Sequence, residues 1–153
     1  MKIAGIITEY NPFHNGHAYQ IEKVRQETGS DYVGIVMSGD FVQRGEPAVL
    51  DKYVRAHMAL ENGADLVLEL PVAFACAGAE YFARGGVSIL NSLGCIDTLC
   101  FGTEQECLSD FEQVASLLSR EPVDFQQLLL SYLKKGMGYP AARSAALSDY
   151  LHT

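Results

Sequence analysis

Four short apolar runs, each followed by a segment with helical spacing, constrain the fold of this chain more than any other feature. The runs occupy residues 2–8, 32–37, 66–70 and 98–101. Apolar runs of this length are typical of strands that are buried on both faces of a parallel sheet. Strands that alternate with helices form α/β folds, because each helix packs back onto the sheet. The sequence therefore predicts an α/β fold with helices on both faces of a parallel sheet.

Helix boundaries follow from the residues that flank the periodic segments. Asn15 is suited to cap a helix that continues to residue 28 and is ended by Gly29. Asp51 is suited to cap the next helix, whose inward-facing residues we expect to be Val54, Met58 and Leu60. A further helix is expected over residues 80–93, before the last apolar run.

The strand signals stop after about residue 105, and helical segments replace them. We expect helices over residues 107–119, 124–135 and 140–151. The sequence therefore predicts a nucleotide-binding core over residues 1–105 and a helical extension over residues 106–153. The chain ends without a closing strand, so we expect it to be the N-terminal part of a longer protein.

Charge and hydropathy argue against a polyanion-binding surface and against a membrane-spanning segment. The formal charge of −8 gives no basic surface for a polyanion, and no apolar stretch approaches the length of about 20 residues that spans a bilayer. We expect a cytoplasmic protein without a signal peptide. None of the cysteines forms a Cys-x-x-Cys pair, so we expect buried, reduced thiols at Cys76, Cys95, Cys100 and Cys107.

Polar residues follow the predicted strands where each one ends. Thr8-Glu9 ends the first strand, Ser38-Gly39-Asp40 the second, Glu69 the third, and Gly102-Thr103-Glu104 the fourth. Ligands of open parallel sheets bind at the carboxyl ends of the strands. These residues are therefore expected to share one edge of the sheet.

Two histidines three residues apart, His14 and His17, directly follow the first strand. The unpaired N–H groups of a first helical turn attract phosphate, and Gly16 would let a phosphate approach closely. Both imidazoles could then donate hydrogen bonds to the same anion as charge builds up on it. The sequence contains neither a Gly-x-x-x-x-Gly-Lys-Ser/Thr loop nor a Gly-x-Gly-x-x-Gly loop after the first strand.

The string His14-Asn15-Gly16-His17 resembles the HxGH signature of the nucleotidylyltransferase superfamily. That resemblance implies a Rossmann-like, doubly wound parallel sheet, in which both histidines stabilise the α-phosphate while pyrophosphate leaves. The longer strings GIITEYNPFHNGHAYQI, SGDFVQRGEPAVLDKYVRAHMALENGADLVLELP and FGTE resemble the tRNA(Met) cytidine acetate ligase family.

The family resemblance implies a reaction and a set of partners. Members activate acetate with ATP to acetyl-adenylate and transfer the acetyl group to the wobble cytidine of elongator tRNA(Met), giving N4-acetylcytidine. Magnesium is expected with the ATP, with no metal ligand assigned in the protein. Family members are longer and supply further ATP contacts, an Asn and an Arg, from beyond residue 153. The tRNA would be held mainly by that part, so we expect little or no ligase activity from this chain alone.

By the same resemblance, His14 and His17 are the catalytic residues. The residues that would bind ATP are Ile7, Thr8, Glu9, Tyr10, Asn11, Pro12, Phe13, His14, Asn15, Gly16, His17, Ala18, Tyr19, Gln20 and Gly102.

Several charged residues have competing interpretations. Asp40 could orient a substrate or hold magnesium through water, or be a turn carboxylate. Arg44 and Lys52 could meet triphosphate or acetate, or be solvated surface charges. We expect Arg55 and His57 to lie at the surface or in ion pairs.

Other positions and functions also stay open. Glu69 could serve the site or cap the loop that follows it, and Arg143 could approach RNA or phosphate. Two other functions remain alternatives: a nucleotidylyltransferase for a small phosphorylated substrate, and a nucleotide- or tRNA-binding module without chemistry.

Overall fold

The structure is a computed structural model that describes residues 1–103 and 107–151. The chain forms two compact units, Met1–Gly102 and Thr103–Thr153. The boundary that we expected between residues 105 and 106 lies outside the described residues.

The first unit contains a parallel four-stranded sheet. Its strands are β1 (Ile3–Thr8), β2 (Tyr32–Ser38), β3 (Leu66–Leu70) and β4 (Thr98–Cys100), in the order β3-β2-β1-β4. Both neighbours of β1 and both neighbours of β2 run parallel to them. The strand order therefore reverses at β1, and the predicted α/β fold is confirmed.

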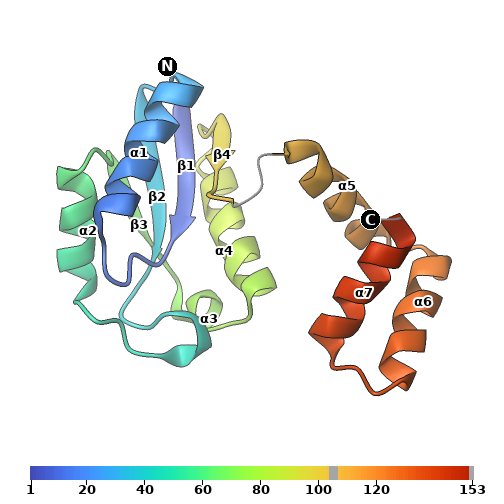
Figure 1. Cartoon of the computed structure of the whole chain (residues 1–153). Helices are drawn as coiled ribbons and strands as arrows, with labels where there is room; N and C mark the ends of the chain where they lie inside the picture. Colours follow the sequence, from blue (N-terminus) through green and yellow to red (C-terminus); the bar gives the residue numbers. More distant parts are fainter. Residues whose placement is uncertain (104–106, 152–153) are drawn as a thin grey trace. The chain divides into compact units, whose positions relative to one another are not determined.

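Helices cover both faces of this sheet (Figure 1). They are α1 (Asn15–Thr28), α2 (Lys52–Glu61), α3 (Val72–Ala75) and α4 (Ala79–Ser92), and a 3-10 turn spans Gln43–Gly45. The sequence did not reveal α3, because four residues are too few to show a helical period.

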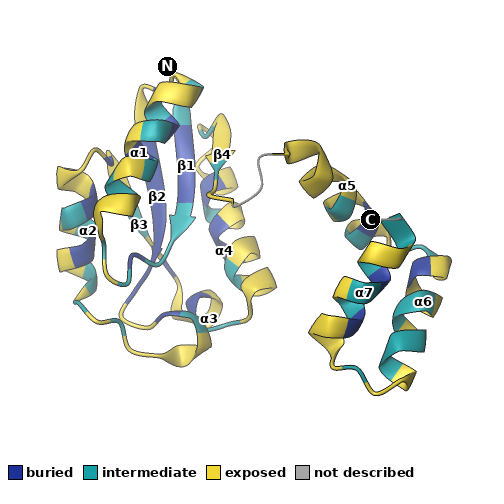
Figure 2. Cartoon of the chain, viewed as in Figure 1, coloured by how far each residue is buried: buried dark blue, intermediate teal, exposed yellow. Residues whose placement is uncertain are grey.

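Alternating residues of the central strands serve two separate cores. Ile35 of β2 packs with Ile21 of α1 and Ala59 of α2, whereas Val36, next along β2, packs with Leu90 of α4. Burial is accordingly greatest along β1 and β2 (Figure 2). This two-sided burial explains why the strands are apolar throughout rather than alternating.

The second unit is helical, as expected. It consists of α5 (Leu108–Arg120), α6 (Val123–Lys134) and α7 (Tyr139–Leu151), whose buried core includes Leu117, Phe125 and Ala146. No helix in the described ranges of either unit is both long and apolar enough to cross a membrane.

The expected inward face of α2 is wrong. Val54 is 46% exposed and Leu60 is 43% exposed, while Met58 is only partly buried. The residues that α2 buries are Arg55 and Ala59. Arg55 is 0% exposed, so its expected surface location is also wrong.

Arg55 can be buried because four backbone carbonyls take the place of water as hydrogen-bond acceptors for its guanidinium. Its Nε donates to Leu50 O at 2.9 Å, and its Nη1 donates to Glu9 O at 2.7 Å and Ser38 O at 3.1 Å. Nη2 donates to Gly39 O. The side chain thus fastens the carboxyl ends of β1 and β2 to the start of α2. Burial lowers the pKa of Arg55, and nearby carboxylates, Asp40 first, oppose this effect.

The cysteines are free thiols, as expected, but they are not buried. Cys95 and Cys107 are exposed, and Cys76 and Cys100 are partly buried. Apolar neighbours in the sequence did not predict burial, because residues beside an apolar residue in a helix or turn can face solvent.

We predict that Arg55→Met lowers the free energy of unfolding by about 3 kcal/mol, because it leaves several buried carbonyls without a donor. Denaturant unfolding followed by circular dichroism measures the change. His57→Ala on the exposed face of α2 is the control and should change stability by less than about 0.5 kcal/mol. Equal effects of the two substitutions would contradict this account.

Candidate functional site

The carboxyl ends of the strands, the start of α1 and the segment between β2 and α2 lie at one end of the sheet (Figure 1). This arrangement brings together residues from distant parts of the sequence. The Glu9 carboxylate Oε1 accepts a hydrogen bond from Gln43 N at 2.8 Å. Asn11 Oδ1 accepts one from Val49 N at 2.7 Å. The turn that precedes α1 is therefore fixed to residues 41–49.

His14, rather than Asn15, caps α1. The backbone of His14 is extended (φ −147°, ψ 174°), and its Nδ1 accepts a hydrogen bond from Gly16 N at 3.1 Å. His17 Nδ1 in turn accepts from His14 N at 3.3 Å. Each histidine thus satisfies a backbone N–H at the helix start, in the reciprocal arrangement of a capping box. The expectation that Asn15 is the cap is wrong, because an imidazole nitrogen takes the place of the usual side-chain oxygen.

The two rings stack, with centroids 3.7 Å apart and planes 23° from parallel. Since both Nδ1 atoms accept hydrogen bonds, a neutral ring carries its proton on Nε2. Two Nε2–H donors therefore accompany the partly positive amino end of α1, which suits an anion.

Gly16 is required by the same arrangement. A Cβ atom at this position would lie 2.9 Å from His14 Cε1, too close for a carbon–carbon contact. The glycine of the motif therefore leaves room for the capping ring, in addition to the access for phosphate that the sequence suggested.

Aromatic residues support His17 from the protein interior. The ring centroids of Tyr10 and Phe13 lie 4.6 Å and 5.6 Å from that of His17. Tyr10 is 1% exposed and has a left-handed backbone conformation (φ 48°). Burial lowers the pKa of His17, and the neighbouring His14 lowers it further. The neutral, donor-competent form of His17 is thereby favoured.

The remaining residues of the predicted ATP-binding stretch have different surroundings. Ile7 packs against α4, where a Cβ at Gly86 would lie 2.6 Å from Ile7 Cγ2. Gln20 and Gly102 approach each other, since a Cβ at Gly102 would lie 3.9 Å from Gln20 Nε2. The end of β4 is therefore next to α1, as the shared edge of the sheet requires. Thr8 is half-buried and Pro12 is exposed.

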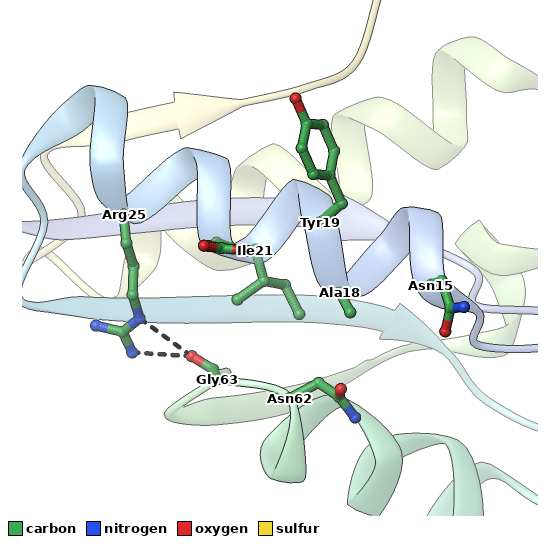
Figure 3. Close-up of a pocket in the computed structure, with 8 residues that line it drawn as sticks. Asn15, Ala18, Tyr19, Ile21, Arg25, Asn62 and Gly63 are labelled. Carbon is green, nitrogen blue, oxygen red and sulfur yellow. Dashed lines mark hydrogen bonds between the residues drawn. The ribbon is translucent and has the colours of Figure 1, made fainter.

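A groove of about 510 Å³ lies beside α1 (Figure 3). Asn15, Ala18 and Tyr19 line one side, and Asn62 and Gly63 line the other. Arg25 closes one end of the groove by donating to Gly63 O. The histidine rings are not part of this groove.

Three charged residues that the sequence treated separately form one cluster. Lys52 Nζ lies 2.9 Å from Glu69 Oε2 and 3.5 Å from Asp40 Oδ2. The hydrogen bond to Glu69 is the main reason that the pKa of Lys52 is raised. Lys52 and Glu69 also line a small cavity of about 110 Å³. Sequence spacing gave no signal for this cluster, because its members come from the segment after β2, from α2 and from β3.

The other charged candidates lie apart from this cluster. His57 is exposed and its Nε2 lies 3.1 Å from Glu61 Oε1, which confirms its expected place at the surface. Arg143 belongs to α7 in the second unit. Within the described residues, no group of three or more His, Cys, Asp or Glu side chains could hold a metal ion.

Comparison with known protein families matches residues 1–153 to the family described as HIGH Nucleotidyl Transferase. The chain belongs to this family. The match includes both the unit that contains His14 and His17 and the helical unit that follows it.

Several relatives are proteins named tRNA(Met) cytidine acetate ligase. The one from Clostridium novyi (strain NT) is 49% identical over 152 residues, 99% of this chain and 38% of the relative. The one from Caldicellulosiruptor saccharolyticus is 52% identical over 147 residues, 96% of this chain and 36% of the relative. The chain thus spans little more than a third of these relatives.

Solved structures of Thermotoga maritima TmcAL have the same fold. A crystal structure with bound alpha-thio ATP has a TM-score of 0.94 and 46% identity, covering 99% of this chain and 37% of that one. An apo crystal structure has a TM-score of 0.95 and the same identity, covering 99% of this chain and 36% of that one.

The Tyr10 hydroxyl is buried and has no hydrogen-bond partner among the described residues. We predict that Tyr10→Phe raises the free energy of unfolding by about 1 kcal/mol, because it removes an unpaired polar atom and keeps the ring contacts. Thermal unfolding measures the change. Tyr10→Leu, which loses the ring, should instead be destabilising, and a loss of stability in Tyr10→Phe would show that the hydroxyl is bonded.

We predict that His17 titrates below its ordinary pKa of 6.5 in the folded protein, because burial and His14 disfavour its charged form. The unfolded chain then binds this proton more readily, so this contribution to stability is lost as the pH falls below 6.5. Chemical shifts of the imidazole protons measure the midpoint, and His17→Asn should abolish this part of the pH dependence. A midpoint above the ordinary value would contradict the burial argument.

Proposed function

We propose that this chain is the ATP-binding, adenylate-forming part of a tRNA(Met) cytidine acetate ligase. The observation that carries the proposal is the stacked His14–His17 pair, whose Nδ1 atoms cap α1 and whose Nε2 atoms are left for a ligand. The identity of 49–52% to relatives with that name supports the choice of substrates. The alpha-thio ATP in Thermotoga maritima TmcAL supports ATP as the nucleotide.

The proposed first step joins acetate to AMP. A carboxylate oxygen of acetate attacks the α-phosphorus of ATP, and the bond from that phosphorus to the β-phosphate bridging oxygen breaks. Pyrophosphate leaves with the electron pair. Nε2–H of His14 and of His17 would donate to α-phosphate oxygens as their negative charge grows, beside the amino end of α1. The segment from Ile7 to Gln20, together with Gly102, would hold the rest of the nucleotide.

The proposed second step gives the acetyl group to tRNA. The exocyclic amine of the wobble cytidine attacks the acetyl carbonyl carbon, the bond to AMP breaks, and the amine loses a proton to the phosphate or to solvent. The charge of −8 does not favour a broad RNA-binding surface on these 153 residues. We therefore place most of the tRNA contact in the additional length that the relatives possess, and the reaction in the cytoplasm.

Magnesium would accompany ATP rather than occupy a site built by the protein. The described residues contain no group of acidic, histidine or cysteine side chains suited to a metal. Mg²⁺ binds readily through substrate phosphates and water, so the triphosphate itself can supply its ligands.

We predict that alanine at His14 or at His17 lowers the acetate-dependent exchange of pyrophosphate into ATP by about 100- to 1000-fold in kcat, with a much smaller change in ATP affinity. The physical reason is that the two donors act mainly on charge that develops in the transition state. The exchange is measured on the polypeptide that carries these 153 residues, with Thermotoga maritima TmcAL as the reference.

His57→Ala is a matched histidine control, since this ring is exposed on α2. It should retain full exchange. Exchange that needs no acetate, or a phosphorylated alcohol that replaces acetate, would identify a nucleotidylyltransferase instead. ATP binding without any exchange would identify a binding module.

A further inference from the structure

Arg44 has a backbone conformation that arginine rarely adopts. It lies in the short turn Gln43–Gly45 with φ 67° and ψ 8°, in the left-handed region that favours glycine. Strained residues of this kind persist only where the surrounding structure enforces them, and they concentrate at ligand-binding sites. The conformation of Arg44 therefore makes its side chain a candidate for binding a ligand.

The segment around Arg44 is firmly held. Val42 N donates to Glu46 O at 2.9 Å, and Ala48 N donates to Asp40 O at 2.9 Å. Val42 itself is 3% exposed and anchors the turn in the interior. Arg44 thus projects from a fixed turn, because its neighbours on both sides are bonded.

The same turn is connected to the loop that carries His14. The Glu9 carboxylate bonds the backbone N–H of Gln43, the residue before Arg44, and Asn11 Oδ1 bonds Val49 N. Glu9 and Asn11 both precede the histidine pair in the loop between β1 and α1. Arg44 and the amino end of α1 are therefore positioned by one shared hydrogen-bond network.

The guanidinium of Arg44 is exposed and has no ion pair or hydrogen bond with any described residue. The arginines of the neighbouring helices are committed elsewhere. Arg25 of α1 pairs with Asp65, and Arg55 of α2 is enclosed by backbone carbonyls. Lys52 is held by Glu69 and Asp40. Arg44 is thus the cation of this segment that is left for a ligand.

We propose that Arg44 binds the β- and γ-phosphates of ATP and then the departing pyrophosphate. This inference rests on the proposed function and adds a third phosphate-binding side chain to His14 and His17. A planar guanidinium presents paired N–H donors in a fixed geometry that matches two phosphate oxygens, whereas a lysine ammonium acts as a point charge. The histidine pair would hold the α-phosphate, and Arg44 would stabilise the charge that collects on the leaving group when the bond to the α-phosphorus breaks.

The position of Arg44 in this network favours the β- and γ-phosphates of ATP, rather than the phosphate backbone of RNA, as its ligand. Arg44 is tied to the loop that leads to the proposed α-phosphate site, and it is the single cationic residue in the sequence from 40 to 46. An RNA-binding surface would instead be expected to gather several cations.

Binding of inorganic pyrophosphate, ATP and AMP to the polypeptide that carries these residues tests the proposal by calorimetry. Arg44→Gly should weaken pyrophosphate and ATP by about 10- to 100-fold, because it removes a charged pair of donors, and should leave AMP within about 2-fold. The affinity of Arg44→Lys for pyrophosphate and ATP should lie between those of the unsubstituted protein and Arg44→Gly. Because glycine accepts the left-handed conformation, Arg44→Gly should fold without loss of thermal stability. Lys2→Gln, at the opposite end of the strands, is the charge control.

Three results would overturn the proposal: equal losses for ATP and AMP, no loss for either, or weaker tRNA binding with unchanged ATP binding. The last result would assign Arg44 to RNA. An unsubstituted protein that binds neither ATP nor pyrophosphate would overturn it as well. If the protein binds pyrophosphate through Arg44 but shows no acetate-dependent exchange, the proposed function fails while this inference stands.

Discussion

The buried Arg55 guanidinium is the interaction on which the geometry of the site depends. It bonds the carbonyls of Glu9, Ser38 and Gly39, which follow or end two adjacent strands, and that of Leu50 just before α2. The backbone leaves the sheet at or just after these residues. One side chain therefore fixes the start of the loop that leads to His14 and the start of the segment that contains Arg44.

The two histidines show how a short motif can set both structure and chemistry. Each ring uses Nδ1 to bond a backbone N–H at the start of α1, and this use fixes the ring orientation. The same bonds place the proton of a neutral ring on Nε2, the nitrogen that the proposed phosphate contact uses. Gly16 is part of this mechanism, because a side chain there would collide with the His14 ring.

Much of this architecture could be predicted from the sequence. The four strands, the parallel sheet and the main helices follow from apolar periodicity, which reports burial directly. One failure arose where a side chain has a distant partner. The inward face of α2 was wrong because Arg55 finds four carbonyls at Leu50 and at the strand ends, and no local pattern reveals such acceptors. The free thiols were also placed too deeply, because apolar neighbours along a chain do not guarantee burial.

From the sequence alone one can predict the order of the strands and of the longer helices, and the place of the His14–His17 motif at the first strand-to-helix turn. These features depend on residues close together in the chain, whose periodicity and capping act locally. The pairing of charges becomes known from the folded structure: Lys52 meets Glu69 and Asp40, Arg55 meets the strand ends, and Arg44 has no partner among the described residues. Electrostatic partners are chosen by proximity in space, and the fold brings together residues that are 12 to 46 positions apart.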